Sequence, residues 1–273
     1  MMRSMITKFL SGMKIPNWLI RETVLNGGGG LNSAILIYIS IMRRASLMMD
    51  GMYVATLSVN DIADDWDWAN LSFGDGYISF DFFLDIFNDI VARHTILHAP
   101  DSNEMANGGH HTYKIKAING CFGPRHDVYL TNQEVYQLVH NSAPRRDCAV
   151  ALLCYVRYKM HAITDWKYKA IVLGKSTIER DTNIDRRDIN GAIRFLERCR
   201  MLDLYEMPAS EKDQKSSEYY NPHIPVYSIP GVTSSSHIEK CAQRFLDAMR
   251  KENEESDKVK ETEEMEGQND QPQ

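Results

Sequence analysis

The sequence lacks the features that mark secreted, disulfide-stapled and membrane-spanning proteins. Its five cysteines are an odd number and include no CxxC pair, which is typical of reduced thiols in a cytosol. Its most apolar run, residues 31–42, is too short to cross a bilayer and precedes Arg43 and Arg44. The first ten residues contain no long apolar stretch and no small-residue cleavage site. We therefore expect a cytoplasmic protein without a secretory signal and without membrane contact.

Motifs that carry chemistry are also scarce. GKST at residues 174–177 resembles the end of a phosphate-binding loop, but that motif requires glycine where Lys169 stands. The cluster Asp64, Asp65 and Asp67 lacks the neighbours of a nuclease site and favours a solvated acidic face. The residues that could ligate a metal match no zinc spacing; they are His98, His110, His111, Cys121 and His126. We expect no enzyme activity, no cofactor and no metal.

Acidic and basic residues are unevenly distributed along the chain. The formal net charge is −6, so the protein is not a polycation, and only local patches can decide whether it binds nucleic acid. Residues 61–89 contain eight aspartates and no basic residue, and residues 250–273 contain nine acidic and four basic residues. Residues 167–200 instead contain nine basic and five acidic residues. The basic patch therefore lies in the carboxy-terminal half.

The periodicity of the first half predicts a winged-helix domain at residues 15–117. The expected elements are a helix at 31–45, a strand at 53–57, a short helix capped by Ser58, a helix at 80–93, and strands at 95–98 and 112–117. Helix, strand, helix, helix and hairpin is the element order of a winged helix. The helix at 80–93 would present Asp81, Asp85 and Asp89, which repel a polyanion. We therefore expect this domain to dimerise or to contact protein.

A connector at residues 118–146 leads to a second predicted winged-helix domain at 147–230. The connector contains TNQE, a capping box for a helix that ends at His140. The second domain is predicted to contain a helix at 148–160, a strand at 169–173, a helix capped by Ser176, a turn at Asn183, a helix capped by Asp185, and wing strands at 202–205 and 225–229. A helix at 236–251 and a disordered acidic tail at 252–273 follow. The predicted fold class is mainly α with small β-hairpin wings.

The helix that follows Asp185 has an apolar face and a basic face. At about 100° per residue, one side collects Ile189, Ala192, Ile193 and Leu196, and the opposite side collects Arg187, Asn190, Gly191, Arg194 and Arg198. Such a helix is suited to the DNA major groove, where arginine and asparagine hydrogen-bond to base edges. Glycine in a helix interior costs roughly 1 kcal/mol relative to alanine, which a close approach to another backbone would explain at Gly191. The alternative is an ordinary amphipathic surface helix.

The predicted DNA site combines this basic face with the cations around it. We expect phosphate contacts from Lys167, Lys169, Lys175 and Arg180, and groove contacts from Arg186, Arg187, Asn190 and Arg194. Ser176, Gly191 and Arg198 complete the site, and Arg200 and Lys215 are candidates for backbone contacts from the wing. Any one of these cations could equally be a solvated surface residue, so the prediction depends on the set.

The two halves repeat the same order of elements. SAILIYI around Tyr38 is similar to ALLCYV around Tyr155, and YVATLSVNDIA is similar to YKAIVLGKSTIE. The similarity is weak, but together with the repeated order it indicates an internal duplication.

The tandem layout resembles plasmid and phage replication initiators built from two winged helices. LNSAILIYISIMRRASL and DGMYVATLSVNDIA are similar to their amino-terminal region, and VLGKSTIERDTNIDRRDINGAIRFLERCRML is similar to their helix-turn-helix, so the resemblance spans residues 15–230. It implies that one domain forms a homodimer while the other binds repeated origin sites and recruits host replication proteins. It also implies DNA contact by Lys175, Arg186, Arg187, Asn190 and Arg194. The acidic first domain departs from those initiators in which this domain contacts DNA too.

Three functions remain open at this stage. The first is a sequence-specific double-stranded DNA-binding protein that initiates replication of a plasmid or phage. The second is a winged-helix transcriptional regulator, and the third is an acidic protein-interaction module or DNA mimic that inhibits a host factor. Repeated direct binding sites favour the first, a single palindrome over the gene's own promoter favours the second, and absence of DNA binding at low salt favours the third.

Overall fold

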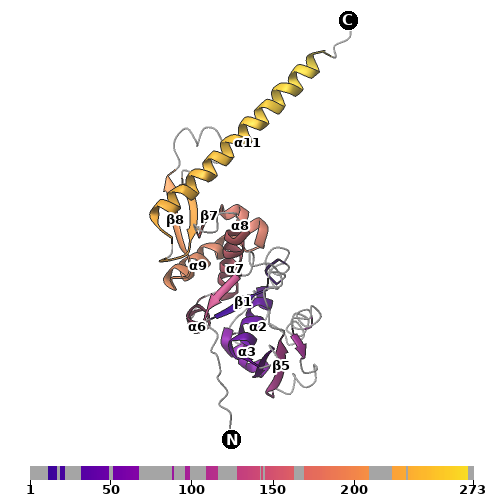
Figure 1. Ribbon diagram of the computed structural model, residues 1–273, viewed down its shortest axis with the longest axis vertical. Helices are drawn as coiled ribbons and strands as arrows, with labels where there is room; N and C mark the ends of the chain where they lie inside the picture. Colours follow the sequence, from indigo (N-terminus) through magenta and orange to yellow (C-terminus); the bar gives the residue numbers. More distant parts are fainter. Residues whose placement is uncertain are drawn as a thin grey trace. The chain divides into compact units, whose positions relative to one another are not determined.

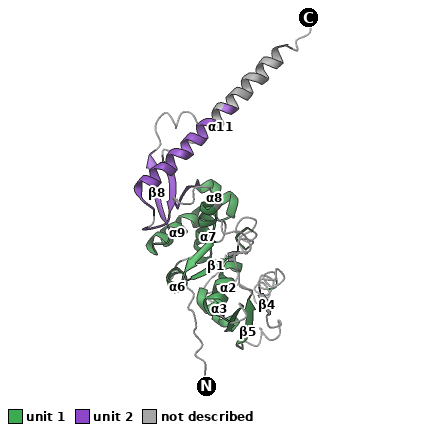
Figure 2. Cartoon of the chain, viewed as in Figure 1, with its two compact units in different colours: residues 1–164, 175–201 green, residues 165–174, 202–273 purple. Residues whose placement is uncertain are grey.

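The computed structural model describes most of the predicted elements of the chain. The described residues are 12–16, 19–21, 32–48, 52–67, 88, 96–98, 109–115, 128–141, 143, 145–162, 169–208, 223–231 and 233–269. They form seven helices and nine strands, and the strands make small antiparallel sheets (Figure 1). The predicted mixture of helices with small β-sheets is confirmed. The chain divides into two compact units, residues 1–164 with 175–201 (unit 1) and residues 165–174 with 202–273 (unit 2; Figure 2).

The first part of unit 1 combines two helices with a four-stranded sheet. The elements are α2 (Asn32–Arg43), β2 (Ser46–Leu47), β3 (Tyr53–Leu57), α3 (Val59–Trp66), β4 (Ile96–His98) and β5 (His111–Ile115). The strand order is β2-β3-β5-β4, with antiparallel pairs throughout. Helix α2 is buried from Ala34 to Met42, as expected for a helix that is apolar on every side. The predictions of a strand at 53–57 and a helix near 31–45 are confirmed.

The cap of α3 also follows the prediction. Ser58 Oγ accepts a hydrogen bond from the Asp61 backbone N–H at 3.1 Å, and Asp61 Oδ2 accepts one from the Ser58 N–H at 2.6 Å. This reciprocal pair is a capping box, which satisfies two backbone donors at the helix start. The helix ends at Asp67, which has a left-handed backbone with φ 52°. Of the helix predicted at 80–93 only Asn88 is described, as helical and exposed, so Asp81, Asp85 and Asp89 lie outside the described residues.

A two-stranded sheet precedes helix α6 (Asn132–His140) and was not predicted. Strand β1 (Gly12–Ile15) pairs antiparallel with β6 (Val128–Thr131), with Gly12 opposite Thr131. A Cβ at Gly12 would lie 2.2 Å from the Leu130 carbonyl oxygen and 2.7 Å from the Tyr129 ring, so only glycine fits. Helix α6 begins at the predicted capping box, in which Thr131 Oγ1 accepts from the Glu134 N–H at 3.2 Å.

Three further helices complete unit 1. They are α7 (Arg146–Ala162), α8 (Lys175–Thr182) and α9 (Arg186–Arg198). Helix α7 is buried continuously from Arg146 to Val156 and packs against both α2 and α9. Because α7 shares a core with α2, the predicted domain boundary at residue 147 does not separate compact units: α7, α8 and α9 belong to the same unit as the first sheet.

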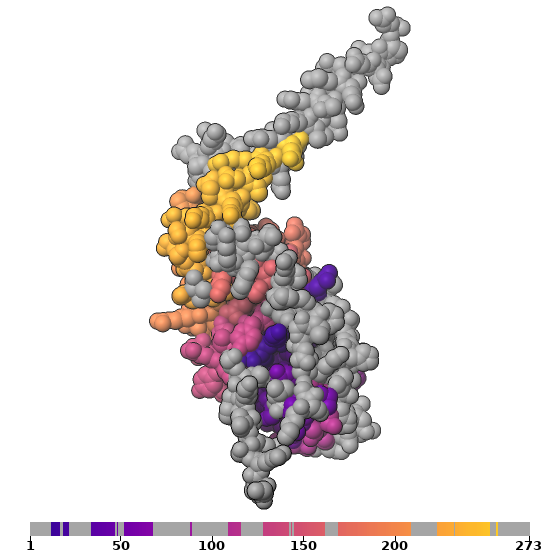
Figure 3. All heavy atoms as spheres, viewed as in Figure 1, coloured from indigo at the N-terminus to yellow at the C-terminus, as the bar shows by residue number. Residues whose placement is uncertain are grey.

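Unit 2 is a three-stranded sheet covered by one helix. Its strands are β7 (Ala170–Val172), β8 (Asp203–Pro208) and β9 (His223–Ser228), in the order β7-β9-β8, and its helix is α11 (Ser235–Asn269). Ala170, Ile224 and Val226 of the sheet pack against Ile238 and Ala242 of α11. Figure 3 shows the first turns of α11, in yellow, lying on the orange strands of this unit.

Two expectations about helix ends are wrong. Residues 252–269, predicted to be disordered, continue helix α11 to Asn269. Their low apolar content prevents them from forming a core. They are nevertheless rich in glutamate and lysine, which favour helix, and have no proline. Ser176 is not the cap of α8, because that helix already begins at Lys175.

The two sheets share one strand order. In the first sheet, β5 is the last strand in the sequence and lies between β3 and β4. In the second sheet, the last strand β9 likewise lies between β7 and β8. The order of helices and strands repeats in the same way, with α2, β3 and α3 in one copy and α7, β7 and α8 in the other.

Candidate nucleic-acid interface

Helices α8 and α9 are joined by a three-residue turn, residues 183–185. Asn183 has φ 54°, and its N–H donates to the Glu179 carbonyl oxygen at 2.8 Å. Asparagine tolerates this left-handed conformation better than most residues, as the sequence indicated. Ile184 is buried and anchors the turn in the core. The turn therefore holds α8 and α9 in a fixed relation.

Asp185 caps α9, as predicted. Its Oδ1 accepts a hydrogen bond from the Arg187 backbone N–H at 2.8 Å. The Arg187 side chain also reaches back to the same carboxylate, with Nε 3.2 Å from Oδ1. Arg187 is 92% exposed and Asp185 50% exposed in this pair, so solvent screens it and it is weak. The guanidinium of Arg187 is therefore free to exchange this partner for another anion.

Helix α9 separates an apolar face from a basic face, as the periodicity predicted. Its buried residues are Ile189, Ala192, Ile193, Phe195 and Leu196, which face the core that contains α7. Burying an aliphatic side chain of this size contributes about 1.5–3 kcal/mol, which fixes the rotation of α9 about its axis. Asn190 is half-buried, and the remaining residues of the predicted face are exposed: Arg187, Gly191, Arg194 and Arg198. The predicted groove residue Arg186 is exposed as well.

The carboxylates beside this basic face have cationic partners within unit 1. Arg145 Nη1 lies 2.9 Å from Asp188 Oδ2, which ties the first turn of α9 to the segment before α7. Asp181 accepts from Tyr155 Oη at 2.7 Å and lies 3.1 Å from Lys159 Nζ. Burial alone would raise the pKa of Asp181, but these hydrogen bonds, with one from Arg180, outweigh it and lower the pKa. The negative charges near α9 are thus largely compensated.

Gly191 has no packing role in the monomer. A Cβ at this position would meet no atom of the described residues within 4 Å, although glycine in a helix interior is destabilising by roughly 1 kcal/mol relative to alanine. The residue lies on the exposed face between Arg187 and Arg194. Packing within the described part of the chain therefore does not require glycine at this position.

The other residues of the predicted DNA site differ in their exposure and in the unit to which they belong. Lys175 is half-buried at the start of α8, Ser176 is exposed, and Arg180 is exposed with Nη2 3.0 Å from Asp181 Oδ1. Lys169 belongs to unit 2, where its carbonyl oxygen accepts from the Ile229 N–H and the Thr233 hydroxyl. Lys167 and Lys215 lie outside the described residues. The structure therefore brings together the α8 and α9 residues of the predicted set.

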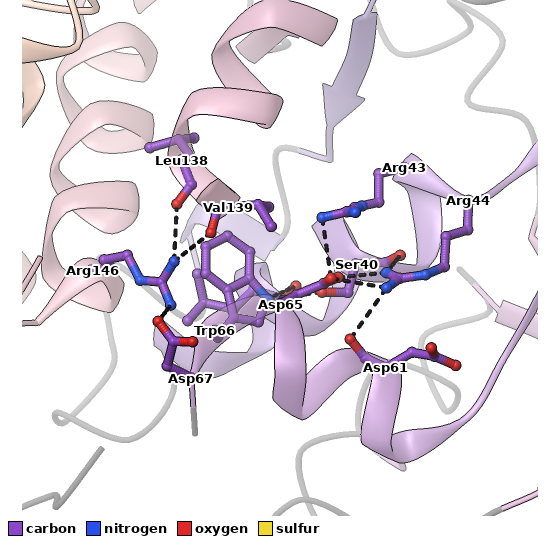
Figure 4. A network of polar contacts seen from close by, with 11 residues as sticks. Ser40, Arg43, Arg44, Asp61, Asp65, Trp66, Asp67, Leu138, Val139 and Arg146 are labelled. Carbon is purple, nitrogen blue, oxygen red and sulfur yellow. Dashed lines mark hydrogen bonds and ion pairs between the residues drawn. The ribbon is translucent and has the colours of Figure 1, made fainter. Parts of the chain in front are cut away.

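A buried polar joint positions α7, and sequence reasoning missed it (Figure 4). Arg146, only 3% exposed, donates to the Val139 carbonyl oxygen at 2.6 Å and to Asp67 Oδ2 at 2.6 Å. Its guanidinium also lies 5.6 Å from the centre of the Trp66 ring. Trp66 is fully buried, and its Nε1 donates to Ser40 Oγ of α2 at 2.8 Å. The joint therefore connects α2, α3, α6 and α7.

The expectation of a solvated acidic face at residues 64–67 is wrong for Asp65; Asp64 and Asp67 are exposed, although Asp67 also has an arginine partner. Asp65 is buried and lies 2.8 Å from Arg44 Nη2 and 3.1 Å from Arg43 Nη1. Asp67 pairs with Arg146, and Asp64 is exposed. Asp65 and Asp67 are thus paired with arginines from α2 and α7 that meet α3 only in the folded chain.

No family model matches this chain, and comparison with curated proteins and with solved structures gives no match. Among the residues that the structure describes, no group of three or more His, Cys, Asp or Glu side chains is placed to hold a metal ion. In the same part of the chain, no helix combines the length and apolar character needed to cross a bilayer. The four described cysteines, Cys148, Cys154, Cys199 and Cys241, are free thiols.

Proposed function

We propose that this protein is a sequence-specific double-stranded DNA-binding protein that initiates replication of a plasmid or phage. The observation that carries the proposal is the outer face of α9, where Arg187, Arg194 and Arg198 are exposed around Gly191. The inner face is fully engaged in the core, so this basic face is presented to solvent in a fixed orientation.

The residue types on this face suit direct readout of base pairs. A guanidinium can donate two hydrogen bonds to guanine O6 and N7, and an asparagine amide can bond to adenine N6 and N7. Arg187, Asn190 and Arg194 supply these groups on successive turns of α9. Gly191 between them allows the helix backbone to approach the groove. Arg186, Arg180 and Lys175 are near enough along α8 and α9 to contact phosphates, which position the protein but carry no sequence information.

The strand orders support two winged-helix motifs in tandem. In each copy a hairpin follows the helices, and its second strand pairs with the strand after the first helix. In the first copy the position of the third helix lies outside the described residues. Two such motifs fit an initiator that uses one for dimerisation or host-protein contact and one for binding. Such an initiator would act without catalysis, by binding and deforming an origin.

The proposal is tested by a mobility-shift assay on a duplex selected from a random library, and by footprinting on the element's own DNA. Arg187→Ala with Arg194→Ala should weaken binding at least about tenfold, because one bidentate base contact contributes about 1–3 kcal/mol. The matched control is Lys240→Ala with Lys251→Ala, which removes two exposed positive charges from α11. Unchanged affinity and sequence preference in the α9 variant would overturn the proposal. Direct repeats in the footprint support an initiator, and a single palindrome supports a regulator.

A further inference from the structure

A second exposed cluster lies beside the carboxy-terminal end of α9. Tyr136 of α6 is 63% exposed, which is unusual for so large an aromatic side chain in this unit. Its ring lies 4.2 Å from the His140 ring, centre to centre, at a tilt of 45°. The two residues are one helical turn apart on the exposed side of α6, and the buried side consists of Val135, Leu138 and Val139. The aromatic pair is therefore presented outward.

Two contacts fix α6 against the end of α9. Asn141, which follows α6, has its Nδ2 at 3.5 Å from Cys199 Sγ, which follows α9. At the other end of α6, Glu134 pairs with Arg157, and Arg157 Nη2 also donates to the Met201 carbonyl oxygen at 3.4 Å. His140 and Asn141 thus lie next to the exposed residues Arg198 and Arg200 that flank Cys199. We call Tyr136, His140, Asn141, Arg198 and Arg200 the α6 patch.

Every side chain of the α6 patch can donate a hydrogen bond. Two guanidiniums, one amide, one imidazole and one phenol are present, and none of them is an acid. The only carboxylate of α6, Glu134, is held by Arg157. A surface that offers donors and positive charge, continuous with the basic face of α9, complements a chain of phosphates.

We propose that the α6 patch binds the phosphate backbone of the same duplex that α9 reads. This inference rests on the proposed function and extends its site by α6, a helix that the sequence predicted but did not assign to the DNA site. Tyr136 and His140 contact phosphate oxygens, while Arg198 and Arg200 provide charge between this contact and the groove. The patch thereby fixes the angle of α9 on the duplex without reading bases.

The test uses the full chain, the duplex selected by the wild type and an unrelated duplex of equal length. Each phosphate contact that neutralises a charge contributes about −0.9 to the slope of log K against log salt. Arg198→Ala with Arg200→Ala should make that slope less negative by about one to two. Tyr136→Ala with His140→Ala should weaken binding severalfold on both duplexes and leave the sequence preference unchanged. The control Met48→Ala removes an exposed side chain elsewhere in unit 1 and should change nothing.

The outcomes separate this inference from the proposed function. If the Arg187 and Arg194 variant loses binding while the variants of the α6 patch keep wild-type affinity and salt slope, the α6 patch does not contact DNA. If Tyr136→Ala with His140→Ala alters the sedimentation coefficient but not DNA binding, the α6 patch is a protein contact and the inference is overturned. If Arg187 and Arg194 are dispensable too, the proposed function itself fails. Thermal unfolding of each variant verifies that the fold is retained.

Discussion

Arg146 and Asp67 are 79 positions apart in the chain, and their side chains are joined by a hydrogen bond of 2.6 Å. The bond connects the first residue of α7 to the left-handed residue that ends α3. Arg146 also satisfies the Val139 carbonyl oxygen of α6. The pair therefore helps to hold α3, which follows β3 of the first sheet, against α6 and α7, the helices that lead to the candidate interface.

The two partners of this joint should differ in their effect on stability. Arg146→Ala removes a buried cation that bonds to a carbonyl oxygen and a carboxylate, and we expect a loss of about 2–3 kcal/mol in the free energy of unfolding. Asp67→Asn keeps a residue type that tolerates the left-handed backbone. Because the Asp67 side chain is 53% exposed and Arg146 keeps the Val139 carbonyl oxygen, solvent screens this pair and about 1 kcal/mol or less should be lost. Urea titration monitored by circular dichroism measures both. Equal losses would contradict the buried role of Arg146.

The pair Glu134 and Arg157 should make stability depend on pH. Burial alone would raise the pKa of Glu134, but hydrogen bonds and charge from Arg157, together with the Thr131 cap, hold the pKa below its ordinary value. The stabilisation is therefore present above the unfolded-state pKa of about 4.3 and is lost as pH falls through the lower folded-state pKa.

The variant Glu134→Gln tests this pH dependence. At pH 7 it should be less stable than the wild type by about 3 kcal/mol, because it leaves Arg157 buried without its anion. The difference should shrink as the pH falls below 4. Parallel unfolding curves between pH 2 and 7 give the comparison, and a difference that stays constant over this range would show that the ionised form of Glu134 has no special role.

Gly191→Ala should change stability and DNA binding in opposite directions. The added methyl meets no atom in the part of the chain that the structure describes, and alanine favours helix over glycine, so the free energy of unfolding should rise by up to about 1 kcal/mol. If the backbone of α9 approaches DNA at this point, affinity for the selected duplex should fall. Thermal unfolding and a mobility-shift assay report the two effects. Higher stability with undiminished affinity would show that the α9 backbone does not approach DNA closely at Gly191.

Asp185→Asn should strengthen DNA binding. Asparagine is as good a helix cap as aspartate, so the cap on the Arg187 N–H is retained. The substitution removes the carboxylate that pairs with the Arg187 guanidinium and that would repel phosphate. We expect affinity to rise by about threefold, within the range of a surface ion pair, and unfolding to remain unchanged. Weaker binding with an intact fold would indicate that the carboxylate itself contacts the duplex, as an acceptor from cytosine.

Removing residues 252–273 should leave unit 2 folded and increase binding to unrelated DNA. The α11 side chains that pack on or near the sheet, Ile238, Ala242, Cys241, Phe245 and Leu246, all precede the cut. The segment contains nine acidic and two basic residues, and its removal changes the net charge from −6 to about +1. Competition with random duplex at low salt measures the effect. A loss of cooperativity in unfolding would show that the distal half of α11 stabilises the sheet.

Local sequence signals predicted much of the fold and of the candidate site. Ser58, Thr131 and Asp185 each cap a helix in the way their positions indicated, and Asn183 adopts the left-handed turn. These signals depend on residues within four positions of one another, so they can be read directly from the chain. The two faces of α9 follow from the same short-range periodicity.

Features that depend on distant residues could not be predicted. Nothing near Asp65 indicates that Arg43 and Arg44 of α2 will neutralise it, so its carboxylate was interpreted as solvated. The ion pairs of Arg145 with Asp188 and of Arg146 with Asp67 could not be predicted for the same reason, because their partners are far apart in the sequence. The grouping of α7, α8 and α9 in one compact unit with the first sheet depends on how α7 packs, whereas the sequence shows only where a connector begins.

The pairing of β1 with β6 has a consequence for how the molecule is made. A ribosome releases residues 12–15 long before it has synthesised residues 128–131, with which they pair in this sheet. Until then the nascent strand carries unsatisfied backbone groups and is a target for chaperones or for the strand of another nascent chain. Slow translation before β6 should therefore lower the yield of native protein more than slow translation after it.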